Sequence, residues 1–328
     1  MRFSIYLIII SIIICQAASL SAFDTSAAER SFLVEEKIRL KNLPDDMDKL
    51  RIWIPYPVSD SSQRIDDFKL SSAFDASIIE GDEYGNKVIY LKPKQKITGL
   101  SASELTFSFK VDRMEYGTPF DPAASEEEAL RFLKPDRLVP VTGEIKRLAE
   151  EITRGKEGDL EKVRAIYDYI IDELTYSKDD PKVCGIGDSL LTLEHKKGNC
   201  TDYHSLFISL VRSLGIPAKF EIGFKIPEDK SQGRIGGYHC WAKFYLKDKG
   251  WIPVDISEAD KHPERRDYFF GRIDENKVHM TSGRDINLKY ANDSQPLNFF
   301  VWPYVEVNGS QFNDVDVEVS FKDLKGAM

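Results

Sequence analysis

The sequence has few cysteine and histidine residues for its length. Of 328 residues, only 4 are Cys and 5 are His. None of them has the C-x-x-C or H-x-x-x-H spacing that is typical of zinc sites and dithiol redox centres. We therefore expect neither a metal ion nor another cofactor.

The sequence also lacks an excess of basic residues. Lys and Arg together number 45 against 54 Asp and Glu, so the formal net charge is −9. Nucleic acids and anionic membrane surfaces attract proteins through clusters of positive charge. Both are therefore disfavoured as partners.

Long hydrophobic runs are missing beyond the N-terminus. Residues 1–16 read MRFSIYLIIISIIICQ, in which Arg2 precedes a short apolar run, and the small residues AASLSA follow. This is the pattern of a secretory signal, with cleavage expected near Ser19–Ala22. An uncleaved anchor is the alternative, but the run is short for a span of roughly 20 residues. We expect an exported protein with residues 1–22 as signal peptide and no integral membrane segment after cleavage.

Export leaves three cysteines, Cys184, Cys200 and Cys240, in an oxidising compartment. Three is an odd number, so at least one thiol is left over unless it pairs between molecules. We expect Cys240 in the core, or in a disulfide with Cys184 if their Cα atoms come within reach. Asn199-Cys200-Thr201 matches the N-glycosylation pattern, and a glycan there would cover Cys200. A functional Cys200 thus favours a bacterial protein that is periplasmic or extracellular.

The hydrophobic pattern changes along the chain. In 23–116 four runs of near-alternating apolar residues, separated by turn signals, predict an N-terminal β-sandwich domain. In 117–292 apolar residues first recur at helical spacing, most clearly over 160–174, and then alternate in KFEIGFKI, HCWAKFYL and WIPVDI. Further strand-like runs predict a C-terminal β segment over 293–328. The fold class is therefore α+β.

Cys200 stands where an amphipathic helix begins, in GNCTDYHSLF. The positive end of a helix dipole stabilises a thiolate, but a nucleophile also needs a base and a group that orients the base. His239 lies at the start of one predicted strand and Asp255 at the end of the next. Consecutive strands pair antiparallel, so these two positions are expected close together.

The parity of that pairing is a constraint. A two-residue turn at Asp248-Lys249 would put Asp255 opposite Ala242, on the face that His239 does not share. A bulge or a loop with an odd number of residues is needed to bring the two side chains together.

The segments GNCTDYHSLFISLVRSLGIPAK and GYHCWAKFYLKDKGWIPVD resemble the core of the transglutaminase-like superfamily, and 269–286 resembles its bacterial members. The resemblance implies a papain-like domain with Cys on a helix N-terminus packed on an antiparallel sheet. It implies Cys200 as nucleophile, His239 as general base and acid, and Asp255 as the orienting carboxylate. Family members often have an aromatic donor upstream of the cysteine. Tyr176 is thus a candidate for the oxyanion hole, the alternative being an ordinary half-buried tyrosine.

Three further residues are expected around these groups. Asp202, in the first turn of the helix, suits the helix dipole or simply caps the helix. His204 follows Cys200 by one turn and is expected to have a supporting role. Trp241 is expected to pack beside the cleft.

The function that follows is cysteine-dependent acyl transfer on a peptide or carboxamide through a thioester. Water as acceptor gives a peptidase or amidase, and an amine gives a transglutaminase; hydrolysis is favoured slightly because no amine site is evident. We expect a protein or peptide substrate, such as a cell-wall peptide. The alternative is a non-catalytic protein-binding scaffold with a transglutaminase-like fold.

Overall fold

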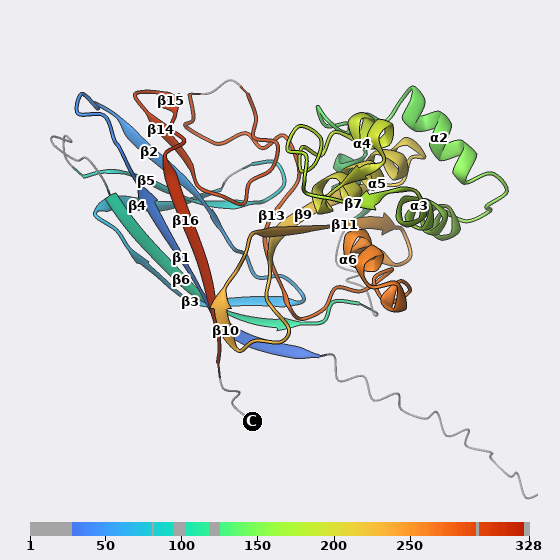
Figure 1. The fold of residues 1–328 in the computed structure, drawn as a ribbon, viewed down its shortest axis with the longest axis horizontal. Coiled ribbons are helices and arrows are strands. Elements are labelled where there is room, and N and C mark those ends of the chain that lie inside the picture. Colours follow the sequence, from blue (N-terminus) through green and yellow to red (C-terminus); the bar gives the residue numbers. More distant parts are fainter. Residues whose placement is uncertain (1–27, 81, 95–102, 118–124, 293–294, 325–328) are drawn as a thin grey trace, which may run out of the picture.

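The computed structural model describes residues 28–80, 82–94, 103–117, 125–292 and 295–324. The predicted signal peptide, residues 1–22, lies outside them. The described part consists of a β-sandwich and, beside it, a body in which helices pack on a separate sheet (Figure 1). The predicted α+β class, with a strand-rich N-terminal region, is confirmed.

The sandwich has two five-stranded antiparallel sheets. In order, the first contains β10 (Gln232–Arg234), β16 (Val315–Asp323), β1 (Glu29–Leu40), β6 (Ser103–Met114) and β3 (Gln63–Ser71). The second contains β15 (Ser310–Gln311), β14 (Tyr304–Val307), β2 (Leu50–Tyr56), β5 (Lys87–Pro93) and β4 (Phe74–Glu80). The alternation is clearest in the long strands β1 and β6, each of which buries one side; in β1 the buried residues include Phe32, Val34, Ile38 and Leu40.

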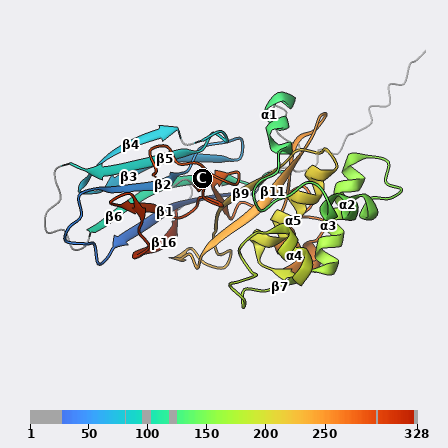
Figure 2. The same cartoon turned by 90° about the horizontal axis from the view of Figure 1, so that it is seen from above.

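The second body is built on a four-stranded antiparallel sheet. Its order is β12 (Gly250–Val254), β11 (Tyr238–Leu246), β9 (Ala218–Lys225) and β13 (Lys277–Ser282). The helices are α1 (Glu126–Leu130), α2 (Glu144–Ile152), α3 (Asp159–Glu173), α4 (Ser189–His195), α5 (Cys200–Ser213) and α6 (Ile256–Lys261), with short 3₁₀ turns η1 (Arg131–Leu133) and η2 (Pro263–Arg265). Figure 2 shows α2 to α5 gathered beside β9 and β11.

Helix α5 is the centre of this body. Every residue from Cys200 to Arg212 is buried, because the helix packs on β11 and β9 and is covered by other helices. Phe207 of α5 meets Phe244 of β11 edge to face, with 6.4 Å between ring centroids. Burial on all sides fixes the helix, and with it the position of Cys200.

The two bodies are interleaved along the chain. The segment 293–328, predicted to follow the helical domain, supplies β14, β15 and β16 to the sandwich, and β16 pairs with β1 over nine residues. Strand β10, from the connection between β9 and β11, adds an edge strand to the same sheet. Both ends of the described chain therefore lie in the sandwich, and the helical body is inserted between them in the sequence. In this part of the chain, no helix is long and apolar enough to cross a membrane.

Candidate active site

Cys200 is the first residue of α5, and its local structure follows from its neighbours. Asn199 is the N-cap: its side chain accepts a hydrogen bond from Thr201 N–H (2.8 Å), while Asp202 accepts one from Asn199 N–H (2.7 Å). This reciprocal capping satisfies N–H groups that a helix start leaves free. Cys200 is only 3% exposed and lies at the positive end of a 14-residue helix.

Asp202 does more than the predicted capping. Its buried carboxylate also accepts hydrogen bonds from Gly185 N–H (2.6 Å) and Gly187 N–H (2.8 Å), which holds that loop against the helix start. Burial raises the pKa of Asp202, and the backbone donors oppose this rise. Gly198 packs on the same side chain, where an added Cβ would lie 2.4 Å from Asp202 Cβ. The turn before Cys200 therefore accepts only glycine at this position.

The loop between β11 and β12 meets the parity condition. Leu246 pairs with Gly250 and Ala242 with Val254, which leaves a three-residue loop, and Gly250 takes a positive φ of 74°. Continuing that register brings Asp255 to the face of β11 that carries His239. The His239 Nε2 and Asp255 Oδ2 atoms are 2.7 Å apart.

The buried pair shifts both pKa values. Burial opposes ionisation of Asp255, but the charges of His239 and Lys277 and the hydrogen bond to His239 hold its pKa well below the usual range. Burial also works against a charged His239, yet the charge and hydrogen bond of Asp255 raise its pKa to about 9. Since Nε2 is engaged by Asp255, Nδ1 is the nitrogen that remains to exchange a proton with Cys200.

The Cys200 thiol has a second cysteine beside it. A hydrogen bond from Cys240 is the largest cause that lowers the pKa of Cys200; burial opposes it, and the hydrogen bond and charge of His239 add to it. Burial and the neighbouring thiolate raise the pKa of Cys240, which therefore stays protonated and acts as the donor. Cys240 Sγ also lies 3.8 Å from Thr201 Oγ1.

This arrangement differs from the disulfide considered for Cys184 and Cys240. Both thiols are free, as is Cys200, and all three are buried. Cys240 faces the first turn of α5, where Cys200 is its neighbour. Sequence reasoning missed this contact because it depends on which residue of β11 packs against the helix start.

His204 joins the two halves of the site. Its Nδ1 is 2.7 Å from the Cys200 carbonyl oxygen, to which it donates, and its Nε2 accepts the Ile256 N–H (3.0 Å). One nitrogen donates and the other accepts, so these contacts require the neutral ring, and burial lowers the pKa of His204 accordingly. His204 therefore ties the nucleophile turn to the residue that follows Asp255.

Tyr176 reaches the site through a short parallel pairing. Strand β7 (Thr175–Tyr176) pairs with β8 (Lys197–Gly198), which places Tyr176 level with Gly198, two residues before Cys200. Burial raises the pKa of Tyr176, and the charge of Cys200 adds to the rise. The phenol thus keeps its proton and can donate a hydrogen bond to an oxyanion.

Trp241 supports the strand that carries His239. It is fully buried, and its indole N–H donates to Glu221 Oε2 (2.7 Å). Its ring centroid lies 6.2 Å from that of His239. Trp241 therefore packs behind the imidazole.

Residues 146–256 match the family model described as the transglutaminase-like superfamily. The match includes Cys200, His239 and Asp255 in that order. This part of the chain, residues 146–256, belongs to the transglutaminase-like superfamily. A structure from Cytophaga hutchinsonii, that of a proposed cysteine protease, superposes with a TM-score of 0.60 at 18% identity, covering 92% of this chain and 93% of that one. This likeness shows a common fold.

Two bacterial proteins are similar to this chain in sequence. An uncharacterized protein of Haemophilus influenzae is 25% identical over 307 residues, which covers 81% of this chain and 82% of that protein. The uncharacterized protein YebA of Bacillus subtilis is 26% identical over 136 residues, 36% of this chain and 18% of that protein.

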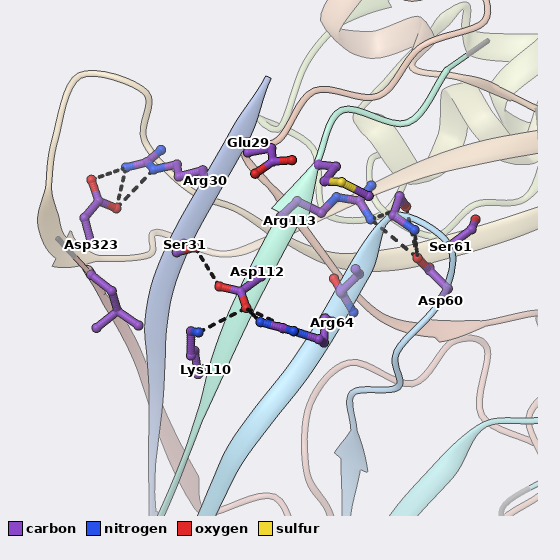
Figure 3. Close-up of a pocket in the computed structure, with 14 residues that line it drawn as sticks. Glu29, Arg30, Ser31, Asp60, Ser61, Arg64, Lys110, Asp112, Arg113 and Asp323 are labelled. Atoms are coloured by element: carbon purple, nitrogen blue, oxygen red, sulfur yellow. Dashed lines mark hydrogen bonds and ion pairs between the residues drawn. The ribbon is translucent and has the colours of Figure 1, made fainter. Parts of the chain in front are cut away.

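A charged pocket of about 1000 Å³ lies at one end of the sandwich of this transglutaminase-like protein (Figure 3). Its walls come from β1, β3, β6, the end of β16 and adjoining loops, and most of its charged residues face one another in pairs. These pairs are Arg30–Asp323, Arg64–Asp112, Lys110–Asp112 and Arg113–Asp60. Cys200, His239 and Asp255 are not among the lining residues, so the pocket is separate from the candidate active site. Nowhere in the described ranges does a group of His, Cys, Asp or Glu have the arrangement of a metal site.

Proposed function

We propose that this transglutaminase-like protein is an exported, cysteine-dependent acyl-transfer enzyme that acts on peptide or carboxamide bonds. The observation that carries the proposal is the buried His239–Asp255 pair, 2.7 Å apart, beside a cysteine at a helix N-terminus. A raised imidazole pKa and a lowered thiol pKa favour the thiolate–imidazolium pair at neutral pH.

The chemistry follows from these roles. Cys200 Sγ attacks the carbonyl carbon of the substrate. The Cys200 N–H and the Tyr176 hydroxyl donate hydrogen bonds to the carbonyl oxygen as it becomes negatively charged. His239 then gives its Nδ1 proton to the amine as the C–N bond breaks, which leaves a thioester on Cys200. An acceptor adds to the thioester while His239 takes its proton, and the C–S bond breaks to restore the thiolate.

Water is the acceptor that we favour. Transfer to an amine requires a site that orients the amine and keeps water out. Hydrolysis makes the protein a peptidase or amidase, and the export signal predicted for residues 1–22 is in keeping with periplasmic or extracellular peptides, including those of the cell wall. An isopeptide product from a glutamine peptide and a primary amine would instead establish transglutamination.

One observation favours the non-catalytic scaffold. Cys200 is 3% exposed, His239 5% and Asp255 not at all, so a substrate carbonyl must displace covering groups to reach the sulfur. In a scaffold this closed site would only stabilise the fold.

Alkylation separates the two functions. The mature protein is treated with iodoacetamide from pH 4 to 10, and peptide mapping follows Cys200, with buried Cys184 as the control thiol in the same digest. We expect Cys200 to react with an apparent pKa well below the usual 8.5 or so, and His239→Ala to raise that value. If Cys200 is unreactive, or titrates as an ordinary thiol with or without His239, the scaffold function is the correct one.

A further inference from the structure

Lys277 is a lysine with no exposed surface that lies directly behind the candidate triad. It begins β13, and its Nζ is 2.7 Å from Asp274 Oδ2 and 3.3 Å from Asp255 Oδ2. The Phe269 ring lies beside it, with 5.3 Å from Nζ to the centroid. A buried ammonium persists only where carboxylates pair with it, so this charge depends on the two aspartates.

Asp255 shares one oxygen between two cations. Its Oδ2 accepts from His239 Nε2 at 2.7 Å and lies 3.3 Å from Lys277 Nζ. Its Oδ1 is engaged elsewhere, with Glu258 N–H and the Ser257 hydroxyl. The field that Asp255 exerts on the imidazole therefore depends on the ammonium at the same oxygen.

Other charged groups around this cluster are accounted for. Glu258 of α6 faces Lys277 but is itself paired with Lys225 of β9 and Lys261. His204 of α5, whose Nε2 is 3.9 Å from Asp255 Oδ1, is held in its neutral form by its two hydrogen bonds. Arg113 of β6 is a further buried cation that interacts with Asp274, whereas Lys277 is the cation that contacts both Asp274 and Asp255.

We propose that Lys277 is a positioning residue which, balanced by Asp274, sets the proton affinity of His239 through the shared Asp255 oxygen. The inference rests on the proposed function, since it concerns how the imidazole serves Cys200. Without the ammonium, two buried carboxylates would hold the imidazolium proton tightly. An acid that must release its proton to the leaving amine works best when its pKa is near the working pH.

The proposal predicts shifts of opposite sign. Lys277→Met leaves Asp255 and Asp274 unbalanced, so the pKa values of His239 and Cys200 should both rise. Asp274→Asn leaves Lys277 to Asp255 alone, so both should fall. The double variant removes one charge of each sign and should return them close to wild type. Charges this close in a buried site interact strongly enough for shifts of about one pH unit, a tenfold change in proton affinity.

The test is the alkylation profile of Cys200 in the mature full-length protein, with its lower transition assigned to Cys200 and its upper one to His239. The matched control is Lys110→Met, a strand lysine that pairs with Asp112 in the sandwich, and it should leave both transitions in place. The expected result is an upward shift in Lys277→Met, a downward shift in Asp274→Asn and recovery in the double variant.

Other results overturn the proposal. One is that all variants show the same alkylation profile as wild type. Another is that the two single variants shift the transitions in the same direction. A third is that the transitions of the double variant lie no closer to those of wild type than the transitions of Lys277→Met do. Unfolding of Lys277→Met would be evident from rapid alkylation of Cys184, and Asp274→Asn and the double variant then decide. The proposed function has its own test in the wild-type profile: an ordinary thiol pKa there refutes the enzyme, whereas an activated Cys200 insensitive to Lys277 and Asp274 refutes only this inference.

Discussion

Glu36 is a carboxyl group in the core of the sandwich. It lies on the buried side of β1, level with Phe107 on β6 and Val319 on β16, and it has no exposed surface. Within the part of the chain that the structure describes, neither carboxyl oxygen has a hydrogen-bond partner. Burial alone raises its pKa from 4.5 to about 8, so the group is largely protonated at neutral pH.

The shift makes the stability of the fold depend on pH. Between pH 4.5 and about 8 the folded state holds a proton on Glu36 that the unfolded state has released. The free energy of unfolding therefore falls as pH rises through this window, by about 1.4 kcal/mol per unit. Over the full window the loss is on the order of 5 kcal/mol, and above the folded pKa no further loss follows.

Urea unfolding at pH 5 and pH 8.5 measures this effect. Glu36→Met fills the same space without an ionisable group, so its stability relative to wild type should increase by several kcal/mol between the two pH values. Glu35→Gln, at the exposed neighbouring position of β1, is the control and should show no such change. If the difference between Glu36→Met and wild type is the same at both pH values, the carboxyl group is not buried without a partner and the reasoning fails.

Two further predictions concern the nucleophile turn. Cys240→Ala removes the thiol that donates to Cys200, so the pH midpoint of Cys200 alkylation should rise; an unchanged midpoint would show that the contact contributes nothing. Gly198→Ala forces a methyl group against Asp202 and should lower the free energy of unfolding by about 1–3 kcal/mol in urea. Gly236→Ala, with open space at its Cβ, is the matched control, and an equal loss in both variants would contradict the packing argument.

The sequence was informative where the pattern is local. The capping residues around Cys200 predict a helix start, and alternation in β11 and β12 predicts two paired strands. The sequence also indicated that a bulge or a loop with an odd number of residues must separate these strands, but not which of the two, nor that Leu246 and Gly250 would form the last pair. That choice depends on the positive φ of Gly250 and on the packing of β11 against α5.

Contacts between distant segments were beyond such reasoning. Lys277 lies 22 positions after Asp255 in a run that reads as an ordinary strand, and no local pattern marks it as buried beside a carboxylate. The pairing of β16 with β1 brings together the two ends of the described chain. Strand β10, from the middle of the chain, pairs with β16 on its other side. Alternation of apolar and polar residues predicted the strands but not which strands pair. Every strand with such an alternation has a similar apolar face, so each could pair with many others.

The two carboxylate oxygens of Asp255 have different roles, one structural and one chemical. Oδ1 accepts the Glu258 N–H and so caps α6, while Oδ2 lies within reach of His239 and Lys277. The cap fixes the carboxylate plane, and the plane fixes the direction from which Oδ2 meets the imidazole. His204, bound to both the Cys200 carbonyl and the Ile256 N–H, holds the nucleophile turn to this same cap. The geometry of the site is therefore set by backbone groups at two helix starts, and its charge is set by side chains from β11 and β13.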